Sequence, residues 1–243
     1  MITKEKTNTY RTTATVVGIV YILGFVVGLT GIGLFTSILG APDHLSTVSA
    51  NSMLLGFAAV LWLLAVIGDA AHGVLMFPVL KQHSERIAIG YLAFRIVDAV
   101  FIAVMVLLVL IQIPLGSEYL KAATSDTSFL QALSTVFSQA QQYAYQIGMS
   151  ALGVSGLMLC YTLYRAKLVA GWLAIWGLVG YATILVGMLS AVMGSGLGDI
   201  SSYVGGLWEV VIGVWLIVKG FNAPAITSQT TTTGKLVTEP LVS

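Results

Sequence analysis

The stretch IAIGYLAFRIVDAVFIAVMVLLVLIQI, residues 87–113, decides the fold class of this chain. Its only charged side chains are Arg95 and Asp98, and the rest is overwhelmingly apolar. An α-helix needs about 20 apolar residues to cross a hydrocarbon core of about 30 Å. The stretch is therefore predicted to form a transmembrane helix.

Six runs of this kind cover most of the 243 residues, and polar or turn-forming segments separate them. The predicted spans are Thr13–Phe35, Leu54–Leu80, Ile87–Ile113, Tyr143–Tyr164, Leu168–Met193 and Ser201–Val218. We expect an all-α integral membrane bundle of six transmembrane helices in residues 13–221. A short N-terminal segment (1–12) precedes it, and a polar, Thr-rich, flexible tail (222–243) follows it.

The longest connection between predicted spans is 114–142. Within it, residues 129–137 read FLQALSTVF, with apolar side chains spaced as in an amphipathic helix. We expect this segment to lie on the outer membrane surface or to cap the bundle.

The composition argues against a soluble domain, a nucleic-acid-binding protein and a cysteine-based metal site. Hydrophobic residues make up 57% of the chain and charged residues 9%, with a mean hydropathy of +0.94, whereas about a quarter of a soluble domain is charged. The net charge is +1 and no basic cluster occurs, so nucleic acid is excluded as a partner. Cys160 is the one cysteine, so an intrachain disulfide or a thiolate metal site cannot form.

The distribution of lysine and arginine predicts the orientation. If the loops alternate sides, one side receives only Lys121, and the other receives Lys4, Lys6, Arg11, Lys81, Arg86, Arg165, Lys167, Lys219 and Lys235. Because basic residues are enriched in cytoplasmic loops, both termini are expected in the cytoplasm of a multi-pass protein of the plasma membrane.

Glycine is abundant, with 26 residues, and several glycines recur at helical spacing. Gly24 and Gly28 are four apart in the first span, and the fifth span ends with Gly180, Gly187 and Gly194 at intervals of seven. Small residues let helix backbones approach closely in a membrane. These faces are expected to meet other helices.

The predicted spans contain five ionisable side chains, which are Asp69, His72, Arg95, Asp98 and Glu209. Such groups are costly at membrane depth and are candidates for a functional site. Counting about 1.5 Å per residue from the nearest cytoplasmic charges places all five at similar depth. We predict a polar cluster near the middle of the membrane, whose residues are candidates for binding a ligand or a proton.

The cluster has three carboxyl groups and one arginine, so two negative charges are left over if every carboxyl ionises and His72 is neutral. Either some carboxyls are protonated, or His72 is charged, or a cation completes the site. Three interpretations remain open at this stage: an ion pair that fixes helix register, a proton- or ligand-binding site, and, most weakly, a metal site of Asp69, His72, Asp98 and Glu209.

Tyr145 and Gln146, near the outer start of the fourth span, are secondary candidates, although tyrosine commonly anchors a helix at the interface. The chain lacks a Walker loop, a nucleophile elbow, a zinc-protease motif and a second membrane histidine for a b-type haem. No cofactor is indicated by any motif.

Several short stretches resemble one family. They are LAFRIV (92–97), YAYQIG (143–148), YR (164–165), GLVGY (177–181) and, after Glu209, WLIVKGF (215–221). From about Arg11 to Phe221 the chain resembles the domain-of-unknown-function family numbered 4386, membrane proteins of bacteria and archaea. The resemblance implies a multi-span protein with Arg95, Tyr145, Arg165 and Glu209 at recurring polar positions, and no particular activity. The family commonly has a histidine where this chain has Gln141 and Gln142.

Three functions are consistent with these features. The first is binding or transport of a small ligand or protons through the buried charges. The second is an accessory or structural subunit that packs against a membrane-protein partner or another copy of the chain. The third is an intramembrane enzyme acting on a lipid-like substrate, with a carboxylate or His72 as general acid–base.

Overall fold

The computed structural model describes residues 2–123 and 126–222, most of which are helical, with no strand among them. The helices are α1 (Ile2–Leu39), α2 (His44–Ala50), α3 (Ser52–Lys81), α4 (Glu85–Lys121), α5 (Thr127–Arg165), α6 (Gly171–Val192) and α7 (Gly198–Val218). Within the described residues, six of them, all except α2, are long and apolar enough to cross a membrane. The predicted all-α bundle of six spans is confirmed. Residues 223–243 of the predicted tail lie outside the described residues.

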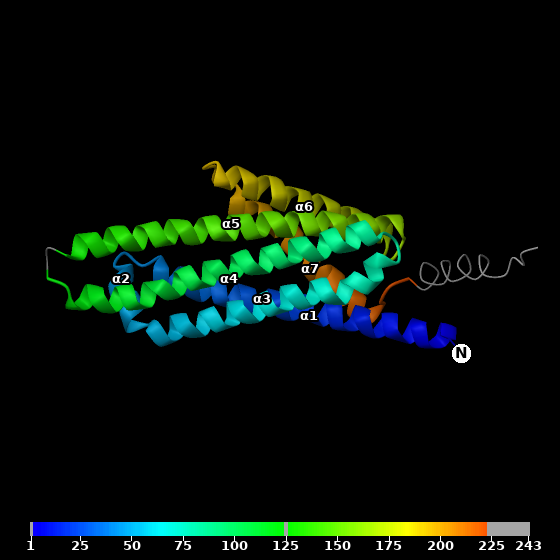
Figure 1. Cartoon of the computed structure of the whole chain (residues 1–243), viewed down its shortest axis with the longest axis horizontal. Coiled ribbons are helices and arrows are strands. Elements are labelled where there is room, and N and C mark those ends of the chain that lie inside the picture. The colour runs from blue at the N-terminus through cyan, green and yellow to red at the C-terminus, as the bar shows by residue number, and fades with distance from the viewer. Residues whose placement is uncertain (1, 124–125, 223–243) are drawn as a thin grey trace, which may run out of the picture.

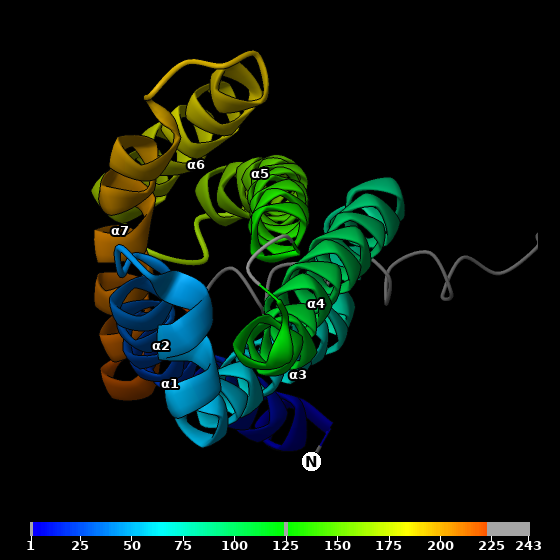
Figure 2. The ribbon, with the colours of Figure 1, turned by 90° about the vertical axis from the view of Figure 1, so that its left-hand side faces the viewer.

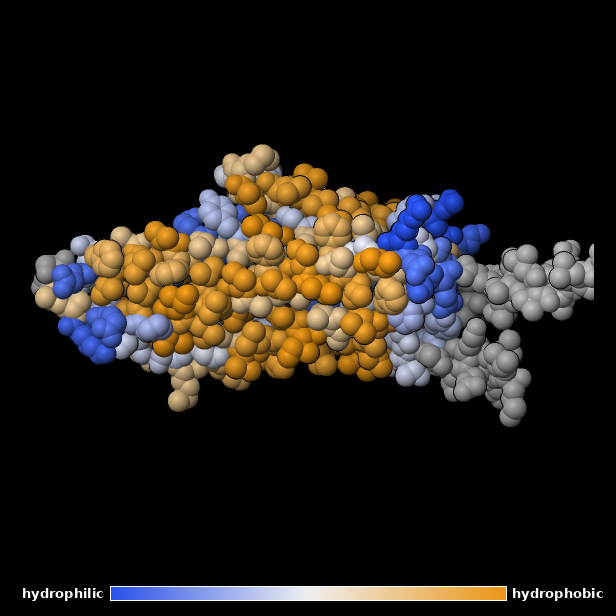
Figure 3. All heavy atoms as spheres, viewed as in Figure 1, coloured by the Kyte–Doolittle hydropathy of each residue, from blue (hydrophilic) through white to orange (hydrophobic). Residues whose placement is uncertain are grey.

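Apolar side chains cover the middle of the molecule, and polar side chains gather at its two ends (Figure 3). Large apolar residues in this middle zone are well exposed, among them Leu107 at 57% and Val186 at 68%. A lipid environment accounts for an apolar surface of this extent, because lipid tails replace water there. The chain is a multi-pass membrane protein.

The six long helices pack in a closed ring. α1 contacts α3, α3 contacts α4, α4 contacts α5, α5 contacts α6, α6 contacts α7, and α7 returns to α1. Figure 1 shows the bundle from the side, and Figure 2 looks along it and shows the helices following one another around it. α1 and α7, the first and last helices among the described residues, are thus neighbours.

The connection between α4 and α5 is much shorter than expected, because α4 continues through Pro114 to Lys121 and α5 begins at Thr127. Residues 129–137 lie in the first part of α5, which runs alongside the last part of α4. The hydroxyl of Ser134 donates to Oε1 of Gln112 over 2.6 Å, and Nε2 of His44 lies 2.7 Å from the same hydroxyl. This buried network joins α5, α4 and α2 and explains why the segment extends the bundle.

Close glycine contacts confirm part of the expected packing. A Cβ added to Gly180 would lie 2.9 Å from Cα of Gly205, and one added to Gly187 would overlap the side chain of Ser201. These contacts join α6 to α7. The expectation is wrong at Gly24 and Gly28, where an added Cβ meets no described atom within 4 Å.

Arg11 closes the ring at the end where the described chain begins and ends. Its guanidinium Nη2 donates to the carbonyls of Ile217 and Val218, over 2.7 and 3.1 Å. These carbonyls belong to the last turn of α7, where no intrahelical donor remains and a positive charge is favourable. Gly220 follows with φ +73, and a Cβ there would lie 2.7 Å from Nη1 of Arg11.

Replacing Arg11 with alanine is expected to lower the free energy of unfolding by about 1 kcal/mol, because the last turn of α7 loses its charged cap. Thermal unfolding of the purified protein in detergent measures this loss. Arg86→Ala, at an exposed position at the start of α4, is the matched control and should change little. Equal stability of the Arg11 variant and the wild type would contradict this role for the cap.

Candidate functional site

Two helices joined by a short loop hold the centre of the charged cluster. Arg95 of α4 donates from Nη2 to Oδ1 of Asp69 in α3 over 2.7 Å, and its Nη1 lies 3.7 Å from Oδ2 of Asp98. Gly73 allows this approach, because a Cβ there would lie 3.2 Å from Cβ of Arg95. Arg95 thus lies between two carboxyl groups, that of Asp69 on α3 and that of Asp98 on its own helix.

Burial differs sharply among these three charges. The side chains of Arg95 and Asp98 are 5% and 1% exposed, whereas that of Asp69 is 32% exposed. Neither carboxylate oxygen of Asp98 has a hydrogen-bond partner among the described residues, and the same holds for Nε of Arg95. Buried polar atoms are normally hydrogen-bonded, so the two Asp98 oxygens could each accept a further hydrogen bond and Nε of Arg95 could donate one.

His72 lies one turn from Asp69, toward the end of α3, and pairs with a tyrosine. Its Nδ1 shares a hydrogen bond with the hydroxyl of Tyr91, which lies one turn before Arg95 on α4. The imidazole also packs against the ring of Tyr21 from α1, with centroids 4.4 Å apart. Its Nε2 is buried without a partner in the described part of the chain.

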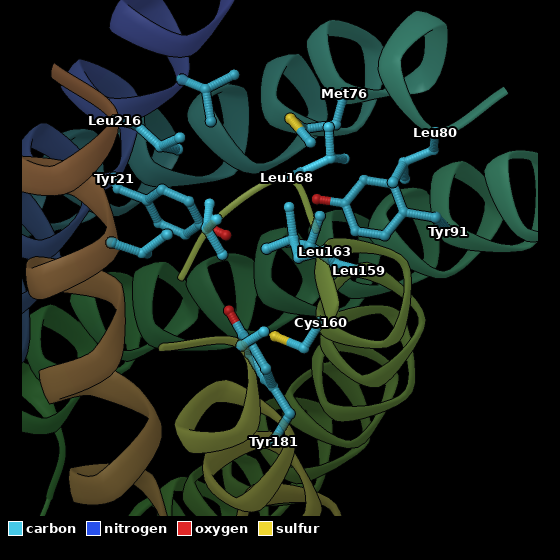
Figure 4. Packing of buried hydrophobic residues seen from close by; sticks show 14 of the residues in the cluster. Tyr21, Met76, Leu80, Tyr91, Leu159, Cys160, Leu163, Leu168, Tyr181 and Leu216 are labelled. Carbon is cyan, nitrogen blue, oxygen red and sulfur yellow. The ribbon is translucent and has the colours of Figure 1, made fainter. Parts of the chain in front are cut away.

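Glu209 of α7 is held by α6 rather than by the arginine. The hydroxyl of Tyr181 donates to Oε1 of Glu209 over 2.8 Å. Trp208 packs between Tyr181 and Tyr21, with centroids 5.3 and 6.2 Å apart, and donates from Nε1 to the carbonyl of Leu173. Figure 4 shows Tyr21, Tyr91 and Tyr181 pointing from three helices toward a shared interior.

Glycine contacts show that these groups lie at one level of the bundle. Gly68 of α3 faces Val20, and Gly213 of α7 faces Ile22. Asp69 and Glu209 are therefore both level with this part of α1. Glu209 also interacts electrostatically with Arg95 and Asp69 across the ring.

We call the five residues Asp69, His72, Arg95, Asp98 and Glu209 the charged layer. The buried apolar residues of the described chain pack around it in two clusters. One includes Met76, Leu163 and Met188, and the other includes Phe35, Val109 and Val48 of α2. The side chain of Asp69 stays 32% exposed, so this packing does not close off the whole layer.

The two secondary candidates, Tyr145 and Gln146, lie on α5. Tyr145 packs edge-on against Trp62, with centroids 6.5 Å apart, and contacts both apolar clusters. Oε1 of Gln146 is buried without a partner in the described residues. The roles of Tyr145 and Gln146 stay predictions.

The residues proposed as metal ligands do not converge. No three His, Cys, Asp or Glu side chains of the described residues are arranged to hold a metal ion. His72 bonds to Tyr91, and Glu209 bonds to Tyr181, so each turns to a tyrosine rather than toward a shared centre. The weakest of the three interpretations therefore gains no geometric support.

Sequence reasoning missed the tyrosines of the site. Tyr91 precedes Arg95 by four residues, so helical spacing alone places both on one face and could have identified it. Tyr21 and Tyr181 lie on helices without an ionisable group at this depth, and only the packing of α1, α6 and α7 brings them to Glu209 and His72.

Comparison with known proteins gives a family and no activity. Neither a curated protein nor a solved structure matches the chain. The model of a family described as Domain of unknown function (DUF4386) matches residues 16–220, which include all seven helices in whole or in part and every member of the charged layer. This multi-pass membrane protein therefore belongs to the DUF4386 family.

Proposed function

We propose that this protein binds a small positively charged species, a proton or a cation, in the charged layer and exchanges it across the membrane. The charge balance supports this most directly, because the charged layer has three carboxyl groups and one arginine, which pairs with only two of them. Surplus negative charge is costly in a low-dielectric interior. A bound proton or cation would offset that cost.

The geometry of Asp98 supports the same proposal. Arg95 lies 2.7 Å from Asp69 and 3.7 Å from Asp98, so its guanidinium pairs more closely with Asp69 than with Asp98. Asp98 is 1% exposed and lacks hydrogen bonds to the described residues. A carboxyl in this position is well suited to hold a proton, and to release it when the arginine moves toward it.

We further propose that both termini face the cytoplasm and that the protein resides in the plasma membrane. Basic residues at one end of the described helices support this orientation, including Arg11, Lys81, Arg86, Arg165 and Lys219. Polar residues at that end are prominent in Figure 3. Basic loops normally remain on the cytoplasmic side.

Proteoliposomes with an entrapped pH-sensitive dye test the proposed exchange. A sodium or potassium gradient across the wild-type liposomes should drive proton movement, and Glu209→Gln should slow it about tenfold, as expected when a membrane-embedded charge is removed. Glu85→Gln is the matched control, because Glu85 is 61% exposed and pairs only with Lys81 at the end of the bundle in the described structure.

Proton movement equal to that of protein-free liposomes under both gradients would overturn the proposal. So would equal rates for Glu209→Gln and Glu85→Gln, because the layer would then play no part. Chloride salts at equal ionic strength on both sides exclude an osmotic cause.

A further inference from the structure

Three of the five tryptophans of the chain meet where α6 begins and α7 ends. The ring of Trp172 stacks on that of Trp176, with centroids 6.4 Å apart, and meets the ring of Trp215 edge-on at 6.2 Å. Trp172 is 56% exposed. Tryptophans that only anchor a protein in the membrane form a belt around it. Because these three share one corner of the bundle, anchoring alone does not account for their grouping.

A lysine ammonium lies on this group of rings. Nζ of Lys219 is 4.2 Å from the centroid of the Trp215 ring, within the range of a cation–π interaction. No carboxylate of the described residues forms an ion pair with Lys219. An ammonium has three N–H donors, and a ring face on one side leaves donors on the other side free. The ring thus positions the ammonium and leaves it available to an anion.

The loop between α5 and α6 brings a second lysine to the same corner. Asn222, three residues after Lys219, donates from Nδ2 to the carbonyl of Lys167 over 2.7 Å and from its backbone N–H to the carbonyl of Leu168 over 2.8 Å. Lys167 is exposed and has a φ of +54. A residue with a Cβ adopts this left-handed conformation only where its surroundings hold it there. The two lysines therefore lie on backbone segments that are tied together.

The end of the bundle that contains this corner carries surplus positive charge. From Arg11 onward, Glu85 is the one carboxylate at this end among the described residues, and it pairs with Lys81 over 2.9 Å. The cations at this end are Arg11, Lys81, Arg86, Arg165, Lys167 and Lys219. A surface of this kind attracts anions and disfavours cations.

An apolar strip continues from Trp172 along the outside of α6. Ile175, Val179 and Val186 follow at helical spacing and are 48%, 53% and 68% exposed. In a membrane, apolar side chains with this exposure contact lipid chains. A molecule with a charged headgroup at Lys219 can therefore lay an acyl chain along this strip.

We infer that the corner formed by Lys167, Trp172, Trp215 and Lys219 binds an anionic phospholipid through its phosphate group. The ammonium of Lys219 pairs with the phosphate in a charge-assisted hydrogen bond, and the apolar strip of α6 contacts the lipid tail. A choline headgroup fits less well, although aromatic rings attract it. Lys219 already covers a face of Trp215 and repels a second ammonium. The net charge of the lipid is thus the basis of selection.

Native mass spectrometry of the detergent-solubilised protein tests this inference, with phosphatidylglycerol and phosphatidylcholine of the same acyl chains present in equal amounts. The wild type should retain phosphatidylglycerol preferentially. Lys219→Gln should weaken that binding about fivefold, the effect expected of one lysine beside an anionic lipid. Arg86→Gln is the matched control, because Arg86 is an exposed cation at the same end, at the start of α4, with no ring contact in the described structure.

Size-exclusion chromatography checks that the variants fold, and Lys219→Arg, which keeps the charge, should retain phosphatidylglycerol as the wild type does. Equal retention of the two lipids by the wild type would overturn the inference. Equal losses of binding in Lys219→Gln and Arg86→Gln would do the same, because the effect would then belong to the surface charge as a whole. Displacement of phosphatidylglycerol by inorganic phosphate at equal concentration would identify a phosphate site instead of a lipid site.

Discussion

Arg95→Leu is expected to destabilise the protein by about 3–5 kcal/mol, the largest effect of any single substitution in the charged layer. Leucine removes the partner of both Asp69 and Asp98 but leaves their carboxyl groups in the bundle. Because total stabilities are only about 5–15 kcal/mol, much of the protein should fail to fold. The yield of monodisperse protein and its thermal unfolding in detergent measure this.

The triple variant Arg95→Leu, Asp69→Asn and Asp98→Asn tests whether the unpaired carboxyl groups cause the loss of stability. It removes the orphaned carboxylates together with the arginine, and should recover a substantial part of the lost stability. Arg165→Leu, an exposed arginine at the end of α5, controls for loss of a positive charge alone. If Arg95→Leu unfolds at the wild-type temperature, the ion pair contributes nothing to the fold.

Gly156→Ala is expected to cost about 1–3 kcal/mol or more, although alanine is the better helix former. A Cβ at this position would overlap the ring of Tyr181, and the backbones of α5 and α6 could not keep their spacing. The ring is 1% exposed and has no free volume into which it could move without disturbing Trp208. Thermal unfolding again provides the measurement.

Gly56→Ala is the matched control for that substitution. Gly56 lies inside α3, and a Cβ there meets no atom of the described residues within 4 Å. Alanine should therefore stabilise α3 by up to about 1 kcal/mol, because only its higher helix propensity acts. The two glycine-to-alanine substitutions should thus change the stability of the protein in opposite directions. A loss of stability in both variants would show that glycine flexibility, not close packing, is important at Gly156.

Much of this architecture is predictable from one sequence, because a transmembrane span is specified by length and polarity alone. Counting residues from the cytoplasmic charges also predicts that Asp69 and Arg95 meet, since α3 and α4 are joined by a short loop and must be neighbours. The partners of His72 and Glu209 were not predictable in the same way. Tyr181 reaches Glu209 only because α6 and α7 approach through their glycines, and nothing in a one-dimensional pattern specifies that pairing.

The glycines show where the pattern misleads. Gly24 and Gly28 are four residues apart and Gly180 and Gly187 are seven apart, and both spacings are consistent with close helix packing. Only the pair on α6 is used in that way. Helical spacing shows which residues share a face of a helix. Whether that face meets another helix depends on how all the helices of the bundle pack together.

The closure of α7 onto α1 has a consequence for biosynthesis. The ribosome makes α1 before α7, so the ring of described helices cannot close until α7 enters the membrane. By then α3 and α4 have emerged as a hairpin in which Arg95 already masks Asp69. Glu209 arrives last, and its tyrosine partner on α6 is inserted just before it. The order of the helices along the chain thus lets each membrane-embedded acid find a partner soon after it leaves the translocation machinery.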